Sequence, residues 1–109
     1  MARTDALQGS LDLLVLELLA RRGPLHGYAL MSAIRELSGD VLRVEQGSLY
    51  PALHRMEEEG WIQAEWAERE SGKRVRAYSL TKAGRKQWEL ATERWTTVTA
   101  AVNRVLRLA

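Results

Sequence analysis

Apolar residues recur at helical spacing in the first 40 residues of the chain. The first set is followed by Gly23 and Pro24, which end a helix, and its members are Leu7, Leu11, Leu14, Val15, Leu18 and Leu19. The second set precedes Ser38 and Gly39, and its members are Leu30, Met31, Ile34 and Leu37. Steps of three and four residues place side chains on one face of a helix. The chain therefore begins with two amphipathic helices.

A third helix is predicted within residues 46–59, beginning near Gly47 or Ser48 and ending at Gly60. Its apolar stripe is Leu49, Leu53 and Met56. Pro51 falls in the first turn, where a missing N–H costs little. The stripe leaves polar side chains on the outer face of this helix.

Two extended segments follow, at residues 61–67 and 75–80. Both are rich in residues that favour strands, and the polar segment ERESGKR separates them. We therefore expect a β-hairpin with a basic tip.

From Thr81 to the end of the chain, small and apolar residues alternate steps of four and three. They are Gly84, Trp88, Ala91, Trp95, Val98, Val102, Val105 and Ala109. This heptad pattern predicts one long helix with a seam for a second copy of the chain, because a lone helix cannot bury such a stripe. The alternative is that the stripe folds back onto the first helix of its own chain.

Three short helices, a hairpin and a long helix indicate a mainly α fold, a winged helix-turn-helix with a long C-terminal dimerisation helix. We expect residues 1–80 to form a DNA-binding domain and residues 81–109 the dimerisation helix. In such folds the third helix enters the major groove and the hairpin is the wing.

Composition narrows the possible functions. With 46% hydrophobic and 28% charged residues, the chain is expected to fold. The absence of Cys excludes disulfides, thiolate nucleophiles and Cys-based zinc sites. The longest apolar run, Leu11 to Ala20, contains Asp12 and Glu17 and is too short to cross a bilayer, and the N-terminal residues do not resemble a secretion signal. We expect a cytoplasmic protein with no membrane partner.

The net charge is only +2, but the basic residues are unevenly placed. Residues 69–86 hold seven cations against Glu70 alone, namely Arg69, Lys73, Arg74, Arg76, Lys82, Arg85 and Lys86. Four of these flank the hairpin turn, where a duplex backbone would lie. The expected partner is double-stranded DNA.

Candidate DNA contacts on the third helix are its polar, outward residues, Gln46, Ser48, Tyr50, His54 and Arg55. On the wing they are Arg69, Lys73, Arg74 and Arg76. The alternatives are that Tyr50 is a core aromatic and that His54 and Arg55 belong to a solvated face. The acidic run 57–59 is expected to face solvent, away from the DNA.

Enzymatic function finds no support in the sequence. With two histidines and no cysteine, a nucleophilic site reduces to a serine activated by His26 or His54, and no motif signals one. His54 with Glu57 and Glu58 could form a metal site, but the spacing is a common surface pattern. No glycine-rich phosphate loop occurs. We expect no catalytic residue, no metal and no cofactor; a protein-interaction module is the remaining alternative, and the basic, polar face disfavours it.

Three motifs occur in order between residues 8 and 86: LHGYALMSAIRE, GSLYPALHRMEEEGWI and GKRVRAYSLTKAGR. With these motifs the chain resembles the PadR-like transcriptional regulators. The resemblance implies a short-tailed dimeric repressor of a neighbouring operon. It matches Ser48, Tyr50 and Arg55 to the recognition helix and Lys73, Arg74 and Arg76 to the wing.

The resemblance also covers the entry to the second helix. There Gly27 would permit close packing, Tyr28 would pack or touch a phosphate, and His26 would help to satisfy the start of the helix.

The chain has four Trp and no Phe. Trp61 and Trp66 are expected in the core. Trp88 and Trp95 lie one heptad apart on the seam, where paired rings could hold an aromatic or cationic effector, as the resemblance allows. The alternative is that both rings simply fill the seam.

Overall fold

The computed structural model describes the backbone of residues 2–107 and the side chains of residues 10–107. The elements, in order, are α1 (Ala2–Arg22), β1 (Leu25–His26), α2 (Gly27–Leu37), α3 (Gln46–Glu58), β2 (Ile62–Glu68), β3 (Arg74–Leu80) and α4 (Lys82–Leu106). This order confirms a mainly α winged helix with a long C-terminal helix. Leu7 and Ala109, which the sequence assigned to the first helix and the seam, lie outside the described side chains.

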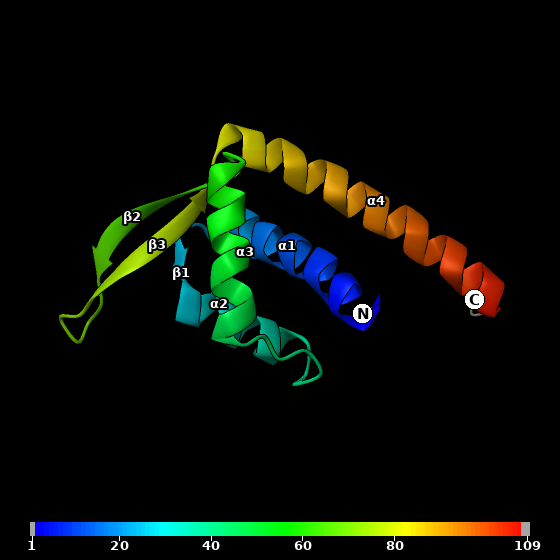
Figure 1. Cartoon of the computed structure of the whole chain (residues 1–109), viewed down its shortest axis with the longest axis horizontal. Coiled ribbons are helices and arrows are strands. Elements are labelled where there is room, and N and C mark those ends of the chain that lie inside the picture. Colours follow the sequence, from blue (N-terminus) through cyan, green and yellow to red (C-terminus); the bar gives the residue numbers. More distant parts are fainter. Residues whose placement is uncertain (1, 108–109) are drawn as a thin grey trace.

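The sheet has one strand more than the sequence predicted. β1 pairs antiparallel with β3, with Leu25 opposite Tyr78 and His26 opposite Ala77, so the strand order is β1-β3-β2. A two-residue strand is too short to show alternation, which is why the pattern predicted only the hairpin. Beyond β1, β2 and β3 continue as a two-stranded wing that projects from the helices (Figure 1).

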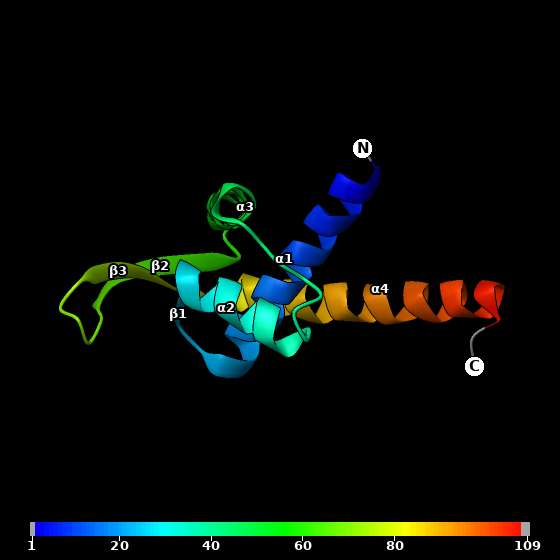
Figure 2. The ribbon, with the colours of Figure 1, turned by 90° about the horizontal axis from the view of Figure 1, so that it is seen from below.

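Helix α1 is the central element of the core. It contacts α2, α3, α4 and β3. It lies between α4 and α2 in Figure 1 and crosses α4 in Figure 2. The buried apolar residues are Leu11, Val15, Leu16, Leu18, Leu19, Leu30, Ala33, Ile34, Leu49, Ala52, Leu53, Met56, Ile62 and Tyr78. The inner stripes predicted for the first three helices therefore meet in one cluster, apart from Leu37, which is exposed.

The start of α4 is fixed to the turn between α3 and β2. The Thr81 hydroxyl donates to the Gly60 carbonyl and accepts from the Gly84 N–H, at 2.5 and 3.0 Å, so it caps the helix and ties it to the turn. Gly84 lies against the Trp61 backbone, and a Cβ placed there would stand 1.8 Å from the Trp61 carbonyl oxygen. Only glycine allows α4 to approach this closely.

The seam of α4 divides into two parts. Gly84 is buried and Trp88 packs against the core of its own chain, so the alternative of folding back holds for the first turns. Further along, Trp95, Val98, Val102 and Val105 stay 48–81% exposed. This part of α4 extends past the rest of the molecule (Figure 1). None of the helices in the described part of the chain has the length and apolar character needed to span a membrane.

We expect Gly84→Ala to destabilise the protein. Alanine normally favours a helix by about 1 kcal/mol over glycine, but the added methyl would overlap the Trp61 carbonyl and cost about 1–3 kcal/mol net. Urea denaturation measures the change. Gly47→Ala is the control, because a Cβ at that position meets no atom within 4 Å. Equal stability of the two variants would contradict the close approach.

Candidate nucleic-acid interface

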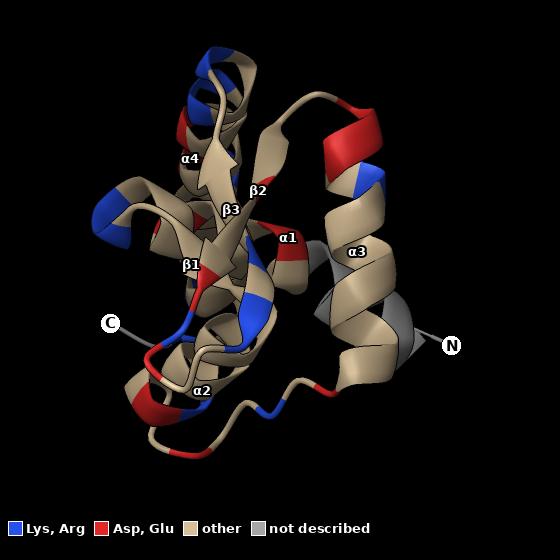
Figure 3. Ribbon diagram, turned by 90° about the vertical axis from the view of Figure 1, so that its left-hand side faces the viewer, with Lys and Arg blue, Asp and Glu red and all other residues tan. Residues whose placement is uncertain are grey.

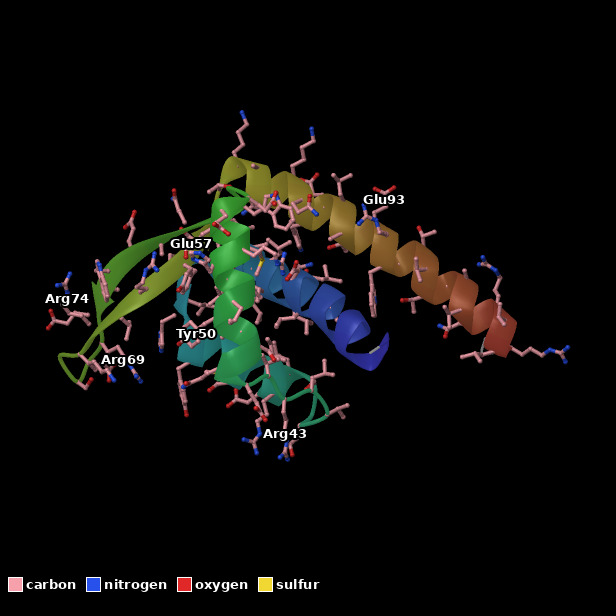
Figure 4. All side chains as sticks on the ribbon, in the orientation of Figure 1. Arg43, Tyr50, Glu57, Arg69, Arg74 and Glu93 are labelled. Carbon is pink, nitrogen blue, oxygen red and sulfur yellow. The ribbon has the colours of Figure 1, made fainter. Side chains whose placement is uncertain are left out.

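A cleft of about 500 Å³ opens between the wing and the N-terminal ends of α2 and α3. Its lining residues are His26, Gly27, Tyr28, Gln46, Tyr50, Trp66, Arg69, Lys73, Arg74, Val75, Arg76 and Tyr78. Four of them are the wing cations, and none is a carboxylate. Figure 4 shows Arg69 and Arg74 on the wing on one side and Tyr50 on α3 on the other. The cleft is therefore cationic, with aromatic and amide groups on its walls.

Helix α3 presents an exposed outer face beside this cleft. Gln46, Ser48, Tyr50 and His54 are all exposed, while the stripe containing Leu49 and Leu53 is buried. Tyr50 is 43% exposed, so it is not a core aromatic. Its hydroxyl lies over Gly27, where a Cβ would stand 2.4 Å away, which confirms that Gly27 permits close packing.

Arg55 does not share this outward placement. Its guanidinium turns back to α1 and donates two hydrogen bonds to the Asp12 carboxylate, at 2.9 and 2.7 Å. The side chains of Arg55 and Asp12 are 39% and 21% exposed. The bond to Asp12 raises the pKa of Arg55 above its ordinary value. Arg55 is thus only partly outward, and its contact with DNA stays a prediction. The helical pattern does not show that α1 offers a carboxylate at this point.

The four wing cations differ in their surroundings. The Arg74 guanidinium stacks over the Trp66 ring at 5.1 Å, and Arg76 lies over Tyr78 at 5.7 Å. The Arg69 N–H donates to the Lys73 carbonyl and closes the turn, which leaves both side chains exposed at the wing tip. Figure 3 shows basic and acidic segments side by side on the wing, which lies across from α3, and further basic segments on α4.

The acidic run at the end of α3 does not lie wholly away from the cleft. Glu57 accepts a hydrogen bond from Arg76 at 2.9 Å, and its side chain is only 23% exposed. The expectation of a solvated run holds for Glu58 and Glu59 and was wrong for Glu57. This ion pair braces the wing against α3 and partly neutralises one of the four cations.

The entry to α2 differs from the expected arrangement. His26 is the N-cap residue, but its side chain makes no capping hydrogen bond, so the expectation that it helps to satisfy the start of the helix was wrong. Its backbone pairs instead with β3. Burial, together with the charge of Arg69, lowers the pKa of His26. Tyr28 is 60% exposed and lines the cleft.

Two tryptophans on the hairpin have different environments. Trp61 is half-buried against the core, as expected. Trp66 lines the cleft and is 62% exposed, so its assignment to the core was wrong. Strand alternation puts Trp66 on the same face as the buried Ile62, but β2 has by then run beyond the helices that cover this face.

Trp88 is enclosed by its own chain. Its indole N–H donates to Glu17 at 2.8 Å, and the guanidinium groups of Arg21 and Arg85 lie 5.8 and 5.7 Å from the ring. Burial opposes the charge of Glu17, but the hydrogen bonds from Arg21 and Trp88 outweigh it and hold the pKa of this carboxyl below its ordinary value. Trp88 is therefore bound to α1, whereas Trp95, further along α4, is 52% exposed.

His54 stands as an exposed surface residue, 3.8 Å from Glu58. Across the described residues, no three His, Cys, Asp or Glu side chains are grouped so that they could hold a metal ion.

Comparison with known proteins agrees with this architecture. Residues 15–90 match the model of the Transcriptional regulator PadR-like family. A transcriptional regulator from Clostridium thermocellum superposes with a TM-score of 0.82 at 29% identity, covering 92% of this chain and 96% of that one. A PadR family transcription regulator from Clostridium difficile gives a TM-score of 0.76 at 27% identity, covering 88% and 97%. The chain belongs to the PadR-like family of transcriptional regulators.

Proposed function

We propose that this regulator represses transcription by binding duplex DNA through the wing cleft. The observation that carries the proposal is the cleft itself, which brings the exposed N-terminal half of α3 together with four cations and no carboxylate. Phosphate neutralisation supplies most of the affinity of such a face, and side chains on a recognition helix supply the sequence discrimination. A winged helix used only for protein interaction has no need of this concentration of positive charge.

The roles follow from exposure and chemistry. Gln46, Ser48 and His54 are assigned to base edges in the major groove, because they carry exposed polar groups on the outer face of α3. Arg69, Lys73 and Arg74 are assigned to phosphates on the wing side. Tyr50 has a hydroxyl at the cleft wall and is assigned to the DNA phosphate backbone between the major and the minor groove. Arg76 contributes less, because Glu57 already accepts its hydrogen bond.

We expect the double variant Lys73→Ala, Arg74→Ala to weaken binding to every duplex alike. Each lost phosphate contact should reduce the slope of log affinity against log salt concentration by about 0.9. Fluorescence anisotropy at several salt concentrations measures the slope. Lys86→Ala, Arg104→Ala removes the same charge from exposed positions on α4 and is the control. An unchanged slope in the wing variant would remove the wing from the interface.

We further propose that the protein is a cytoplasmic homodimer and acts on a neighbouring operon. Residues 1–80 would bind DNA and residues 81–109 would join the two copies, with the first turns of α4 also serving the core. The support is the exposed part of the seam, where Trp95, Val98 and Val102 leave 48–52% of their surface exposed while the heptad spacing continues. Two copies related by a twofold axis would require a palindromic operator.

We expect Val98→Asp, Val102→Asp to yield a monomer, because two charges would be buried in the seam. Light scattering at micromolar concentration gives the mass. Thr97→Asp, Ala100→Asp places the same charges on the exposed side away from the seam and should leave a dimer. A wild-type monomer that binds single half-sites normally would contradict this proposal.

A second candidate function is control by an effector at the dimer interface. Of the two tryptophans that the sequence offered for this site, only Trp95 remains a candidate. Trp88 already has Glu17 and two arginines as partners. Trp95 is 52% exposed, so its ring could pair with its symmetry mate around a planar aromatic or cationic molecule. A ligand with higher affinity for the DNA-free dimer would release the operator.

Titration with planar aromatic compounds tests this candidate. We expect a binding compound to quench wild-type fluorescence saturably and to weaken operator binding, with both effects lost in Trp95→Ala. Absence of any effect on wild type would leave the seam a purely structural interface.

A further inference from the structure

Helix α1 is tied to the recognition helix by an ion pair in the partly buried zone between them. Asp12 and Arg55 are 43 residues apart in sequence, and the pair has fork geometry, with both guanidinium N–H groups on the two carboxylate oxygens. Such bidentate contacts fix orientation as well as distance. The hydrophobic stripe of α3 sets its depth against α1, and the ion pair restricts its rotation about that stripe.

The same helix carries a second polar tie, five residues further on. Glu17 accepts the indole N–H of Trp88 at 2.8 Å and so joins α1 to α4. Arg21, one turn later, bonds to Glu17 and lies over the Trp88 ring. α1 therefore stands between α3 and α4, with a specific side-chain bond to each.

We propose that Asp12 and Glu17 are positioning residues, through which α1 fixes the recognition helix relative to the seam-bearing helix α4. The inference rests on the proposed DNA-binding function and assigns Arg55 to α1 rather than to a base. Discrimination between operator and other DNA then depends on both ties, because base contacts need α3 at one angle in the groove, whereas phosphate contacts tolerate several.

A positioning role and a purely stabilising role predict different results. Asp12→Asn raises the net charge by one and loosens the fork, so affinity for a scrambled duplex should hold or rise while affinity for the operator falls. A variant that only lost stability would lower the active fraction, and both affinities would fall by the same factor.

Anisotropy with an operator duplex from the region upstream of the protein's own gene and a scrambled duplex tests the inference on full-length protein. We expect Asp12→Asn to lower the affinity ratio of operator to scrambled duplex about tenfold, since a rotated α3 loses a base contact. Trp88→Phe, which keeps a ring but loses the N–H donor, should lower the ratio severalfold. Glu93→Gln makes the same charge change on an exposed face of α4 and should leave the ratio unchanged.

A double-mutant cycle separates positioning from direct reading of a base by Arg55. If the pair acts as a unit, Asp12→Asn, Arg55→Gln and their combination lose the same discrimination. If Arg55 reads a base, only the Arg55 variants lose discrimination, and the inference is overturned. It is also overturned if Asp12→Asn and Trp88→Phe both keep the wild-type ratio, or if both duplexes weaken equally. Should wild type bind neither duplex, the proposed function itself fails.

Discussion

The structure depends on a single requirement, that α3 must be held rigidly by one side while its other side stays free. Leu49, Leu53 and Met56 are fully buried in the cluster that α1 centres, so the inner stripe meets half of this requirement. Apolar packing is not directional, however, and a helix seated only by leucines can rotate. The bidentate Asp12–Arg55 ion pair is directional and fixes the rotation of α3 about its axis. The orientation of the exposed residues of α3 therefore depends on this pair.

Charge in this protein acts through placement. The net charge of +2 says little about DNA, but the cleft lining has four cations and no carboxylate. Arg74 stacks on Trp66 and Arg76 bonds to Glu57, so both are held in place, whereas Arg69 and Lys73 extend from the wing tip. A wing with two fixed and two freer cations combines a defined hairpin angle with side chains that can adjust to a phosphate backbone.

The helices and the hairpin could be predicted from the sequence because each has a period of its own, and Gly23, Gly39 and Gly60 mark where the helices end. β1 could not be predicted, since a strand of two residues is too short to show an alternating pattern. The placements of Arg55, Glu57 and Trp88 depended on which side chain stands opposite, 19 to 71 residues away in the chain, and spacing within one helix does not contain that information. The prediction that Trp66 lies in the core was wrong for a different reason. This residue lies on the same strand face as the buried Ile62, but β2 extends beyond the helices that would have covered it.

The division of the α4 seam into a buried and an exposed part also depends on contacts that the spacing within one helix does not show. Heptad spacing predicted a continuous interface from Trp88 onward. However, Gly84 allows the first turns of α4 to pack closely against Trp61, and Trp88 then bonds to Glu17 on α1 of its own chain. Only beyond this point does α4 separate from the core. The internal tie and the proposed dimer contact thus occupy successive parts of one stripe.

In the proposed function, two copies of this chain place α3 in successive major grooves, with the wings on the flanking backbone. A hydroxyl-radical footprint on the region upstream of the protein's own gene tests this most directly. A dimer bound in this way protects two symmetric patches on one face of the duplex, with half-site centres about 34–36 Å apart or a multiple of that distance. A single patch, or no protection at concentrations where the protein is soluble and folded, would contradict it.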